Sequence, residues 1–575
     1  MAKKSTIVVL KFGSSVLRGE EDLPTVVHEI YRWWRDGAQV IAVVSAFGDT
    51  TDELMRRAEK ICAHPCQSVL PSLLATGEST SAALLALALK KAGIAARLLD
   101  EVQAKLRTVS GSTDAVPVAV DVPRLVRESE RAVVVLPGFV GRDESGDRTV
   151  LGRGGSDLTA LFLAHQLQAR CVLIKDVDGL YTSDPALSVS PMSRFTHASY
   201  DTAIRLGGRV VQTKAARFAA ANKVHFSITS IGAQDETEVG PVADRLGVVD
   251  SPLEPLRVAL LGCGTVGEGV FERIKAFPNL FTLTGVGTRT GQRARAASVP
   301  DRLITSDLEG LIEGPCDVVI ELIGGVNRAG SLIEQSLRLG RAVVTANKAL
   351  VAQSCDLFER LAHENKSTFK YSAAVGGCMP AIETVRRARE RGPLRSIRGV
   401  LNGTCNFVID QIATGSSFDD AVREAQRAGY AEANPGLDLD GIDAAQKLVL
   451  LARVAFNINL PLRSISLEGI RALNSEAIRS AHERGRTVRL VAECRQTSAG
   501  LVEASVRPIE LTFDHPLAQV QGVENRLVVE PEVGEPIVTS GAGAGRWPTT
   551  EAVVADLLDV VGAHSARDVR LEACA

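Results

Sequence analysis

A glycine-rich turn near the middle of the chain places the strongest constraint on its fold. The segment Leu256–Val270, LRVALLGCGTVGEGV, leads an apolar run directly into glycines spaced G-x-G-x-x-G, and a helical pattern follows. In a dinucleotide-binding turn the first glycine (Gly262) makes the bend, the second (Gly264) lets a pyrophosphate approach the backbone, and the third (Gly267) packs helix against strand. Because purely structural turns share this spacing, the prediction of a Rossmann domain depends on the surrounding residues.

The composition excludes several classes of protein. A length of 575 residues suggests about three to four domains. The net charge of −3 and the lack of a long basic run argue against binding to nucleic acid or to a membrane surface. No stretch approaches the ~18 apolar residues of a membrane span, and the N-terminus does not resemble a signal peptide. The ten scattered cysteines fit reduced thiols, so we expect a cytoplasmic protein without a cysteine metal site.

The first half of the chain alternates between strand and helix patterns, which predicts a parallel α/β sheet. Its strands end in loops rich in Gly, Ser and Asp, and a helix Ser79–Ala92 is expected after Gly77-Glu78. Such loops at the carboxyl ends of strands bind ligands, and their backbone N–H groups suit phosphates. Lys11 lies where a cation could hold a phosphoryl group in transfer, and Asp176 and Asp178 could face a nucleotide or Mg²⁺.

Five segments of this half, VLKFGSSV, VVSAFGDTTDEL, TGES, LGRGGSDLTA and DVDGLYTSDP, together resemble the aspartate kinase branch of the amino acid kinase family over residues 6–231. The resemblance implies the amino acid kinase fold and Mg·ATP-dependent phosphorylation of the β-carboxylate of L-aspartate. It also implies that Lys11 stabilises the transferring phosphoryl group. The other residues that it assigns are, for the aspartate and phosphate side, Ser45, Thr51, Glu78, Arg153, Gly155, Ser156 and Asp157, and for the nucleotide side Asp176, Asp178, Tyr181 and Lys214.

Three departures from that family pattern keep other hypotheses open. The glycine loop after Lys11 is one residue shorter than usual, Lys175 replaces the usual threonine before DVDG, and Gln212–Ala215 replaces an HPRA-like segment. A kinase-like half that is weak or purely structural, or that accepts another amino acid carboxylate, is therefore the alternative. The polar residues 236–255 are expected to form a linker, too short for the ACT regulatory modules that such kinases usually carry. Without them we expect little inhibition by threonine or lysine.

Two features after the glycine turn point to reductive chemistry. The second strand of this half ends at Arg289, where an NAD enzyme usually has an acidic residue, so the 2′-phosphate of NADP is favoured while NAD stays possible. Asp443 and Lys447 lie four residues apart before an apolar helical run, and therefore on one face of a buried helix. A lysine with a carboxylate partner can donate a proton to a carbonyl that is being reduced, although a surface ion pair is the simpler interpretation.

Seven segments, among them LGCGTVGEGV, VTANKAL, LNGTCNFV, GYAEANPGLDLDGIDAAQK and SGAGAGRWPTTEAVVADLL, resemble homoserine dehydrogenase over residues 257–565. The resemblance implies hydride transfer between NAD(P)H and L-aspartate 4-semialdehyde, with Lys447 as general acid/base. It assigns the substrate side to Asp443, Glu432, Gly429 and Lys348, and the cofactor side to Lys348, Gly262, Gly264, Thr265, Val266, Gly267, Arg289, Gly543 and Gly545. Val375, Gly377 and Met379 match a monovalent-cation (Na⁺) site whose usual glutamate is Ser372 here.

The sequence therefore predicts two α/β enzymes in one chain, acting on small molecules and assembling as a homo-oligomer. The expected domains are an amino acid kinase domain at 1–235, a linker at 236–255, a Rossmann domain at 256–380, an α+β catalytic and dimerisation domain at 381–540, and a segment at 541–575 that returns to the nucleotide-binding domain. We expect no C-terminal ACT module.

Overall fold

The computed structural model describes residues 6–183, 193–206, 208, 210–233, 235–247, 254–497 and 501–572. The chain forms two compact units, Met1–Leu253 and Glu254–Ala575, and each is described by itself.

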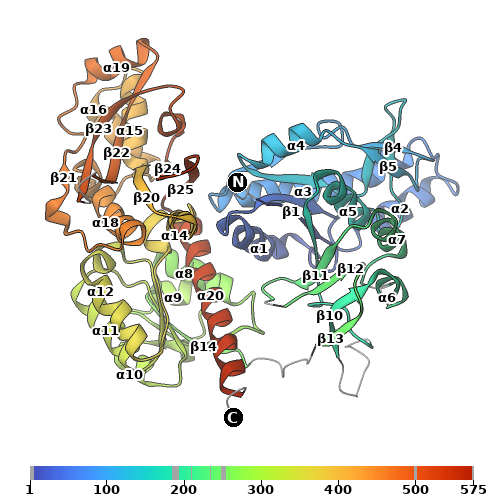
Figure 1. Ribbon diagram of the computed structural model, residues 1–575, viewed down its shortest axis with the longest axis horizontal. Coiled ribbons are helices and arrows are strands. Elements are labelled where there is room, and N and C mark those ends of the chain that lie inside the picture. Colours follow the sequence, from blue (N-terminus) through green and yellow to red (C-terminus); the bar gives the residue numbers. More distant parts are fainter. Residues whose placement is uncertain are drawn as a thin grey trace. The chain divides into compact units, whose positions relative to one another are not determined.

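The N-terminal unit is built on a nine-stranded sheet with the order β13-β10-β12-β11-β9-β1-β2-β6-β3 (Figure 1). The six strands from β11 to β3 are parallel, and the apolar runs of β1, β2 and β6 are buried, as expected where helices cover both faces. Helix α5 packs on β1, and the side chains of Val9, Ile41 and Val43 share its core. The strands are β1 (Ile7–Phe12), β2 (Gln39–Val44), β3 (Ala96–Leu98), β6 (Val133–Pro137), β9 (Arg170–Lys175), β10 (Arg194–Ser199), β11 (Phe226–Ser230), β12 (Thr237–Gly240) and β13 (Arg245–Gly247).

The remaining elements of this unit are its helices and a small four-stranded sheet of order β5-β4-β7-β8. The helices are α1 (Leu23–Arg35), α2 (Thr50–Ile61), α3 (Leu70–Lys91), α4 (Val122–Ser129), α5 (Gly155–Leu167), α6 (Tyr200–Leu206) and α7 (Thr213–Asn222). The small sheet comprises β4 (Arg107–Val109), β5 (Val116–Ala119), β7 (Val140–Arg142) and β8 (Arg148–Val150).

Two sequence expectations for this unit are wrong. The expected linker contributes β12 and β13 to the sheet, where β12 pairs antiparallel with β11 and parallel with β10. Its Gly and Pro content suggested a linker, but short strands near a sheet edge tolerate these residues. Gly77 and Glu78 lie inside α3 rather than before it. The glycine does not end the helix here but lets it pack closely, since a Cβ on Gly77 would lie 2.9 Å from the Cβ of Ala46.

Helix α3 is long and apolar enough to cross a membrane, but half of its apolar window is buried inside the unit. It packs on β3 and β6 and carries the buried Glu78 near its centre. These features are those of a core helix in a soluble α/β domain.

The C-terminal unit begins with a parallel six-stranded sheet of order β16-β15-β14-β17-β18-β19, the arrangement of a Rossmann domain. Its strands are β14 (Leu256–Leu261), β15 (Phe281–Gly287), β16 (Ile304–Thr305), β17 (Val318–Glu321), β18 (Ala342–Thr345) and β19 (Phe369–Lys370). Its helices are α8 (Thr265–Ile274), α9 (Gln292–Ala296), α10 (Leu308–Glu313), α11 (Asn327–Arg338), α12 (Lys348–Glu364) and α13 (Ala373–Gly376).

The rest of this unit is an α+β layer. A six-stranded sheet of order β21-β23-β22-β20-β24-β25 is antiparallel except for the β21–β23 pair. Helix α20 (Arg546–Glu572) packs against α8 of the Rossmann sheet, where Arg273 and Glu551 form a buried ion pair of 2.7 Å. The strands are β20 (Leu394–Val400), β21 (Ser466–Leu467), β22 (Arg486–Gln496), β23 (Val502–Thr512), β24 (Glu524–Pro531) and β25 (Ile537–Ala542), and the helices are α14 (Ala381–Arg391), α15 (Gly403–Ala413), α16 (Phe418–Arg427), α17 (Gly436–Leu439), α18 (Ile442–Phe456) and α19 (Ser475–Glu483).

The expected fold class is confirmed: a parallel-rich sheet forms one unit, and a Rossmann sheet with an α+β layer forms the other.

Candidate active sites

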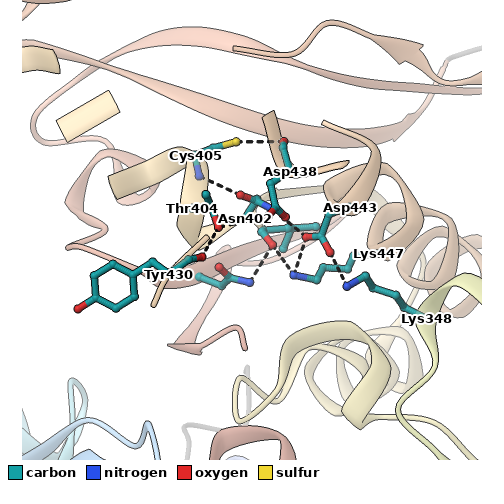
Figure 2. A network of polar contacts seen from close by, with 10 residues as sticks. Lys348, Asn402, Thr404, Cys405, Tyr430, Asp438, Asp443 and Lys447 are labelled. Atoms are coloured by element: carbon teal, nitrogen blue, oxygen red, sulfur yellow. Dashed lines mark hydrogen bonds and ion pairs between the residues drawn. The ribbon is translucent and has the colours of Figure 1, made fainter. Parts of the chain in front are cut away.

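Lys447 and Asp443 form a buried ion pair in the first turns of α18. Lys447 Nζ lies 3.0 Å from Asp443 Oδ2, and each side chain is 7% exposed. Lys447 Nζ also donates to the carbonyl of Leu401 at 2.7 Å, and the Nδ2 group of Asn525 donates to the same oxygen at 2.9 Å (Figure 2). The i,i+4 spacing therefore produces a fixed ammonium group rather than a solvated surface pair.

A second lysine reaches the same carboxylate from a different element. Lys348, the first residue of α12, places Nζ 2.6 Å from Asp443 Oδ1, and Asn402 Nδ2 donates to Asp443 Oδ2 at 2.9 Å. Burial alone would raise the pKa of Asp443, but the ammonium groups of Lys447 and Lys348 hold it well below its ordinary value. Burial would lower the pKa of Lys348, and Asp443 outweighs this and raises it. Asp443 is thus an ionised anchor for two ammonium groups.

Sequence reasoning missed Asn402, Asp438 and Asn525 of this network. Asn402 Nδ2 donates to Asp438 Oδ1 at 2.7 Å, while Asn402 Oδ1 accepts from Cys405 N at the start of α15 (Figure 2). Burial raises the pKa of Asp438, and the nearby Asp443 acts in the same direction. The signal for Asn402 was its position as the N-cap of a helix in LNGTC.

Glu432 and Gly429 lie at the open side of this network. Glu432 is exposed, and its charge contributes to the raised pKa of Lys348. Gly429 has a φ of +76°, and the neighbouring Tyr430 carbonyl accepts from the Thr404 hydroxyl at 2.7 Å. The structure thus places the exposed Glu432 close enough to Lys348 for their charges to interact.

The three glycines of the turn have different surroundings. Gly262 has a φ of +105°, and a Cβ there would lie 2.5 Å from the Leu322 carbonyl oxygen. A Cβ on Gly267 would lie 2.1 Å from the Gly262 carbonyl oxygen, whereas a Cβ on Gly264 would meet nothing nearer than Arg293 Nη1 at 3.9 Å. Only Gly264 therefore faces open space, at the N-terminus of α8 where Thr265 and Val266 are the first residues. A dinucleotide pyrophosphate fits this cradle.

Two arginines follow β15, the strand that pairs with β14. Arg289 follows β15 and is exposed, as is Arg293, whose guanidinium lies near Gly264. Neither forms an ion pair among the described residues. Exposed guanidinium groups at the end of the second strand of a dinucleotide-binding sheet suit a 2′-phosphate.

The chain beyond β25 lies next to Asn525, which belongs to the polar network around Lys447. A Cβ on Gly543 would lie 1.9 Å from Asn525 Nδ2, so only glycine lets this loop pass Asn525, and Gly545 has a φ of +116°. A Cβ on Gly377 (φ +51°) would lie 2.8 Å from the Ala542 carbonyl oxygen. The three residues expected at a cation site lie in and after α13: Val375, Gly377 and Met379, whose carbonyl accepts from Ala381 N at 2.7 Å.

The N-terminal unit holds a second buried network, formed by Lys11, Lys175 and Asp157. Lys11 Nζ lies 2.6 Å from Asp157 Oδ1, and Lys175 Nζ lies 2.9 Å from Asp157 Oδ2. Burial lowers the pKa of Lys11 to about 8, although the Asp157 carboxylate acts against it. Burial would raise the pKa of Asp157, but Lys11 and Lys175 hold it at about 2. Sequence reasoning identified Lys175 only as a departure and not as a member of this network.

Glu78 is another buried acid of this unit. Its side chain points into the unit from α3, it is 3% exposed, and its Oε2 has no hydrogen-bond partner. Burial raises the pKa of Glu78 to about 7, opposed by the charge of Lys11. A buried carboxylate oxygen without a hydrogen-bond partner is costly, so Oε2 is placed to accept a hydrogen bond from a ligand.

The other expected residues on the aspartate side lie after β2, in α2 and at the start of α5. Ser45 and Thr51 are half-buried after β2, where the Ser45 carbonyl accepts from Ser81 Oγ of α3 at 2.7 Å. Ser156 is buried at the start of α5, and Arg153 just before it is exposed. The N-terminus of α5 therefore presents Ser156 and Asp157 together.

The expected nucleotide-side residues do not all converge. Asp176 is exposed after β9, and Tyr181 donates its hydroxyl proton to Asp178 Oδ1 at 2.6 Å. Lys214, in contrast, donates to Asp114 Oδ1 at 2.5 Å and to the Leu151 carbonyl at 2.8 Å. Lys214 thus ties α7 to the loops beside β5 and β8.

Comparison with known proteins agrees with this division. Residues 6–230 match the amino acid kinase family, residues 262–371 match the NAD-binding domain of homoserine dehydrogenase, and residues 380–558 match homoserine dehydrogenase itself. The homoserine dehydrogenase of Synechocystis sp. is 34% identical over 324 residues, which cover 54% of this chain and 75% of that protein. The homoserine dehydrogenase of Pseudomonas aeruginosa is 35% identical, covering 54% of this chain and 73% of its own length.

A crystal structure supports the same relationship. The homoserine dehydrogenase of Thiobacillus denitrificans is 35% identical, with a TM-score of 0.52 over 54% of this chain and 74% of that one. The two families expected from the motifs are therefore confirmed, as is a nicotinamide cofactor-binding domain. The chain belongs to the homoserine dehydrogenase family and carries an amino acid kinase domain ahead of its dehydrogenase.

Proposed function

We propose that this chain catalyses two reactions, the reduction of L-aspartate 4-semialdehyde to L-homoserine with NADPH and the phosphorylation of L-aspartate to 4-phospho-L-aspartate with Mg·ATP. The observation that carries the first reaction is the ammonium group of Lys447, fixed by Asp443 and the Leu401 carbonyl. The buried Lys11–Asp157–Lys175 network carries the second.

In the dehydrogenase, Lys447 acts as the general acid. NADPH supplies the hydride that reduces the aldehyde carbon, and the aldehyde oxygen gains negative charge as this happens. The two contacts of Lys447 Nζ use two of its three N–H groups, so the third can donate to that oxygen. Homoserine oxidation runs the same proton transfer in reverse. Lys348 orients the carboxylate group of the substrate, and the Glu432 carboxylate orients its ammonium group.

The cofactor is held at the glycine turn. The open side of Gly264 and the first N–H groups of α8 (Thr265 and Val266) suit the pyrophosphate, and Arg289 with Arg293 suits the 2′-phosphate, so NADP is favoured over NAD. Gly543 and Gly545 complete the cofactor side.

In the kinase, catalysis rests on charge neutralisation. A β-carboxylate oxygen of aspartate forms a bond to the γ-phosphorus of Mg·ATP, the bond from that phosphorus to the β-phosphate oxygen breaks, and no proton moves. Lys11 neutralises the transferring phosphoryl group, and Asp157 holds Lys11 in place. The unpartnered Oε2 of Glu78 suits the ammonium of aspartate, with Ser45, Thr51, Arg153 and Ser156 around it. Asp176, Asp178 and Tyr181 serve the nucleotide.

Three finer proposals accompany these reactions: a cytoplasmic homo-oligomer, a Na⁺ ion on the carbonyl groups of Val375, Gly377 and Met379, and a kinase that feedback effectors inhibit little. The second candidate function is an active dehydrogenase with a weak or structural kinase domain, and the contacts of the expected nucleotide-side residue Lys214 with Asp114 and the Leu151 carbonyl favour it.

One assay separates the two candidates. The purified chain is incubated with Mg·ATP and hydroxylamine, with and without L-aspartate, and aspartyl hydroxamate and ADP are measured. Aspartate-dependent formation of both supports the two-enzyme proposal. Homoserine oxidation without any aspartate-dependent ADP release would leave only the dehydrogenase.

A further inference from the structure

The proposed kinase reaction includes Lys175 in its buried network but assigns it no contact with a substrate. This residue ends β9, is 8% exposed, and places Nζ 2.9 and 3.1 Å from the two oxygens of Asp157. A lysine that is nine-tenths buried loses side-chain entropy and hydration, so its position needs a physical explanation.

The sheet register places Lys175 beside Lys11 at the ligand-binding edge. In the parallel pairing of β1 with β9, Lys11 lies opposite Leu173, and residues two apart on a strand share a face. Lys175 therefore shares the face of Lys11 and lies one pleat nearer to the carboxyl end of the sheet. Ligands of open α/β sheets bind beyond that end.

The two lysines carry more positive charge than the protein around them neutralises. Lys11 Nζ lies 2.6 Å from Asp157 Oδ1 and already neutralises that carboxylate. The ammonium group of Lys175 therefore gives the triad of Lys11, Lys175 and Asp157 a net charge of +1. The other buried acid close to Lys11, Glu78, is only partly ionised near neutral pH. A buried surplus of charge is costly without a counter-ion, and a polyphosphate supplies one.

The loop after Lys11 strengthens this conclusion. A Cβ on Gly13 would lie 2.8 Å from Lys11 Nζ, so the loop backbone runs directly over the ammonium group. This loop is the one that is a residue shorter than the family pattern, and it therefore offers one backbone N–H fewer to a phosphate. An added lysine on the same face supplies a replacement donor.

We propose that Lys175 is a second phosphate-binding cation of the kinase site, which contacts the β- and γ-phosphate oxygens of the nucleoside triphosphate beside Lys11. This inference rests on the proposed kinase function. In the transfer step, negative charge builds on the β-phosphate oxygen as its bond to the γ-phosphorus breaks and the electron pair leaves with the nucleoside diphosphate. Lys175 keeps its proton and stabilises that charge.

The test compares Lys175→Met, Lys175→Thr and Lys175→Arg in the full-length chain. Binding of the non-hydrolysable analogue Mg·AMP-PNP is measured by titration calorimetry without aspartate. Loss of one charge-assisted hydrogen bond predicts an affinity about 10- to 100-fold lower for Lys175→Met and Lys175→Thr. Lys175→Arg keeps the charge and should stay within about threefold. The KM for aspartate should change by less than about twofold, because the contact is to the nucleotide.

The matched control is Lys105→Met, which removes a lysine from another ion pair of the same unit, Lys105–Asp121 at 2.9 Å. It should leave AMP-PNP affinity unchanged, and thermal unfolding shows whether each variant is folded. Unchanged AMP-PNP affinity in Lys175→Met, or an equal loss in Lys175→Arg, would overturn the inference. Absence of aspartate phosphorylation in the unsubstituted chain would refute the kinase proposal instead, and the binding measurement would still decide the role of Lys175.

Discussion

Substitution of Lys447 tests the dehydrogenase mechanism most directly. Lys447→Ala removes the proposed proton donor together with the N–H that binds the Leu401 carbonyl. General acid catalysis by a positioned group contributes about 10²- to 10⁴-fold, so kcat for semialdehyde reduction should fall by that factor. The effect on KM for NADPH should be small, because no contact of Lys447 involves the glycine turn.

The network also determines how much stability this substitution costs. Removal of one partner from a buried ion pair typically costs about 3–5 kcal/mol, because the remaining charge is uncompensated. Asp443, however, keeps Lys348 at 2.6 Å and Asn402 at 2.9 Å, and the Leu401 carbonyl keeps the Asn525 amide. We therefore expect the free energy of unfolding to fall by less than that, about 1–3 kcal/mol by the loss of a charged hydrogen bond.

Two further variants make the interpretation specific. Lys447→Arg retains the positive charge, but a guanidinium does not give up its proton, so this variant should be as slow as Lys447→Ala while binding substrate better. Lys370→Ala is the matched control, since it removes a half-buried lysine from the Lys370–Asp559 pair at 2.9 Å in the same unit.

The assay follows NADPH oxidation at saturating semialdehyde, with aspartate-dependent ADP release from the same preparation as a second readout. The kinase rate should be unchanged in all three variants. A kcat within about threefold of the unsubstituted chain for Lys447→Ala would refute the role of Lys447 as proton donor.

Three other predictions concern the cofactor, its phosphate and the buried acid of the kinase. Gly264→Ala should weaken NADPH binding at nearly unchanged thermal stability, since the added Cβ meets open space. Gly267→Ala should also destabilise the unit, because its Cβ would lie 2.1 Å from a carbonyl oxygen. Fluorescence titration with NADPH and thermal unfolding distinguish the two variants. Arg289→Ala should raise KM for NADPH at least about 10-fold and leave KM for NADH within about twofold, by the loss of a charged hydrogen bond to the 2′-phosphate; equal changes for both cofactors would contradict this. The pKa of Glu78 rises on folding from 4.5 to about 7, so its contribution to stability is present below pH 4.5 and is lost as the pH rises through 7. Glu78→Gln should therefore unfold at a higher temperature than the unsubstituted chain at pH 8 but not at pH 5. The same difference in unfolding temperature at both pH values would refute the assignment.

Local patterns predicted the residues that act within one element. The pair Asp443 and Lys447 follows from i,i+4 spacing on a helix, and the roles of Gly262, Gly264 and Gly267 follow from the order of strand, turn and helix. These features depend on backbone geometry, which sequence spacing determines directly.

Partners from distant segments could not be predicted in this way. Lys348 reaches Asp443 from the start of another helix, and Asn525 lies 124 residues from the Leu401 carbonyl that it binds. The position of Gly77 inside α3 depends on the close approach of Ala46 from the loop after β2, and β12 is defined by pairing with β10 and β11 rather than by its own sequence. Such contacts result from how the elements pack, which no local pattern encodes.

The two networks use the same electrostatic arrangement for different chemistry. In each, one buried aspartate whose pKa is lowered holds two lysines, Lys447 and Lys348 on Asp443, and Lys11 and Lys175 on Asp157. Each triad has a net charge of +1, and the ligand groups proposed to face it are a developing alkoxide in the dehydrogenase and phosphate oxygens in the kinase. The ammonium of Lys447 must give up its proton, so two fixed contacts and one open N–H are sufficient there. Lys11 and Lys175 must keep theirs, and two cations on one carboxylate spread the neutralising charge over a phosphate that has several oxygens. On the proposed mechanisms, the same triad therefore serves proton donation where one donor is left open, and phosphoryl transfer where both cations face the anion.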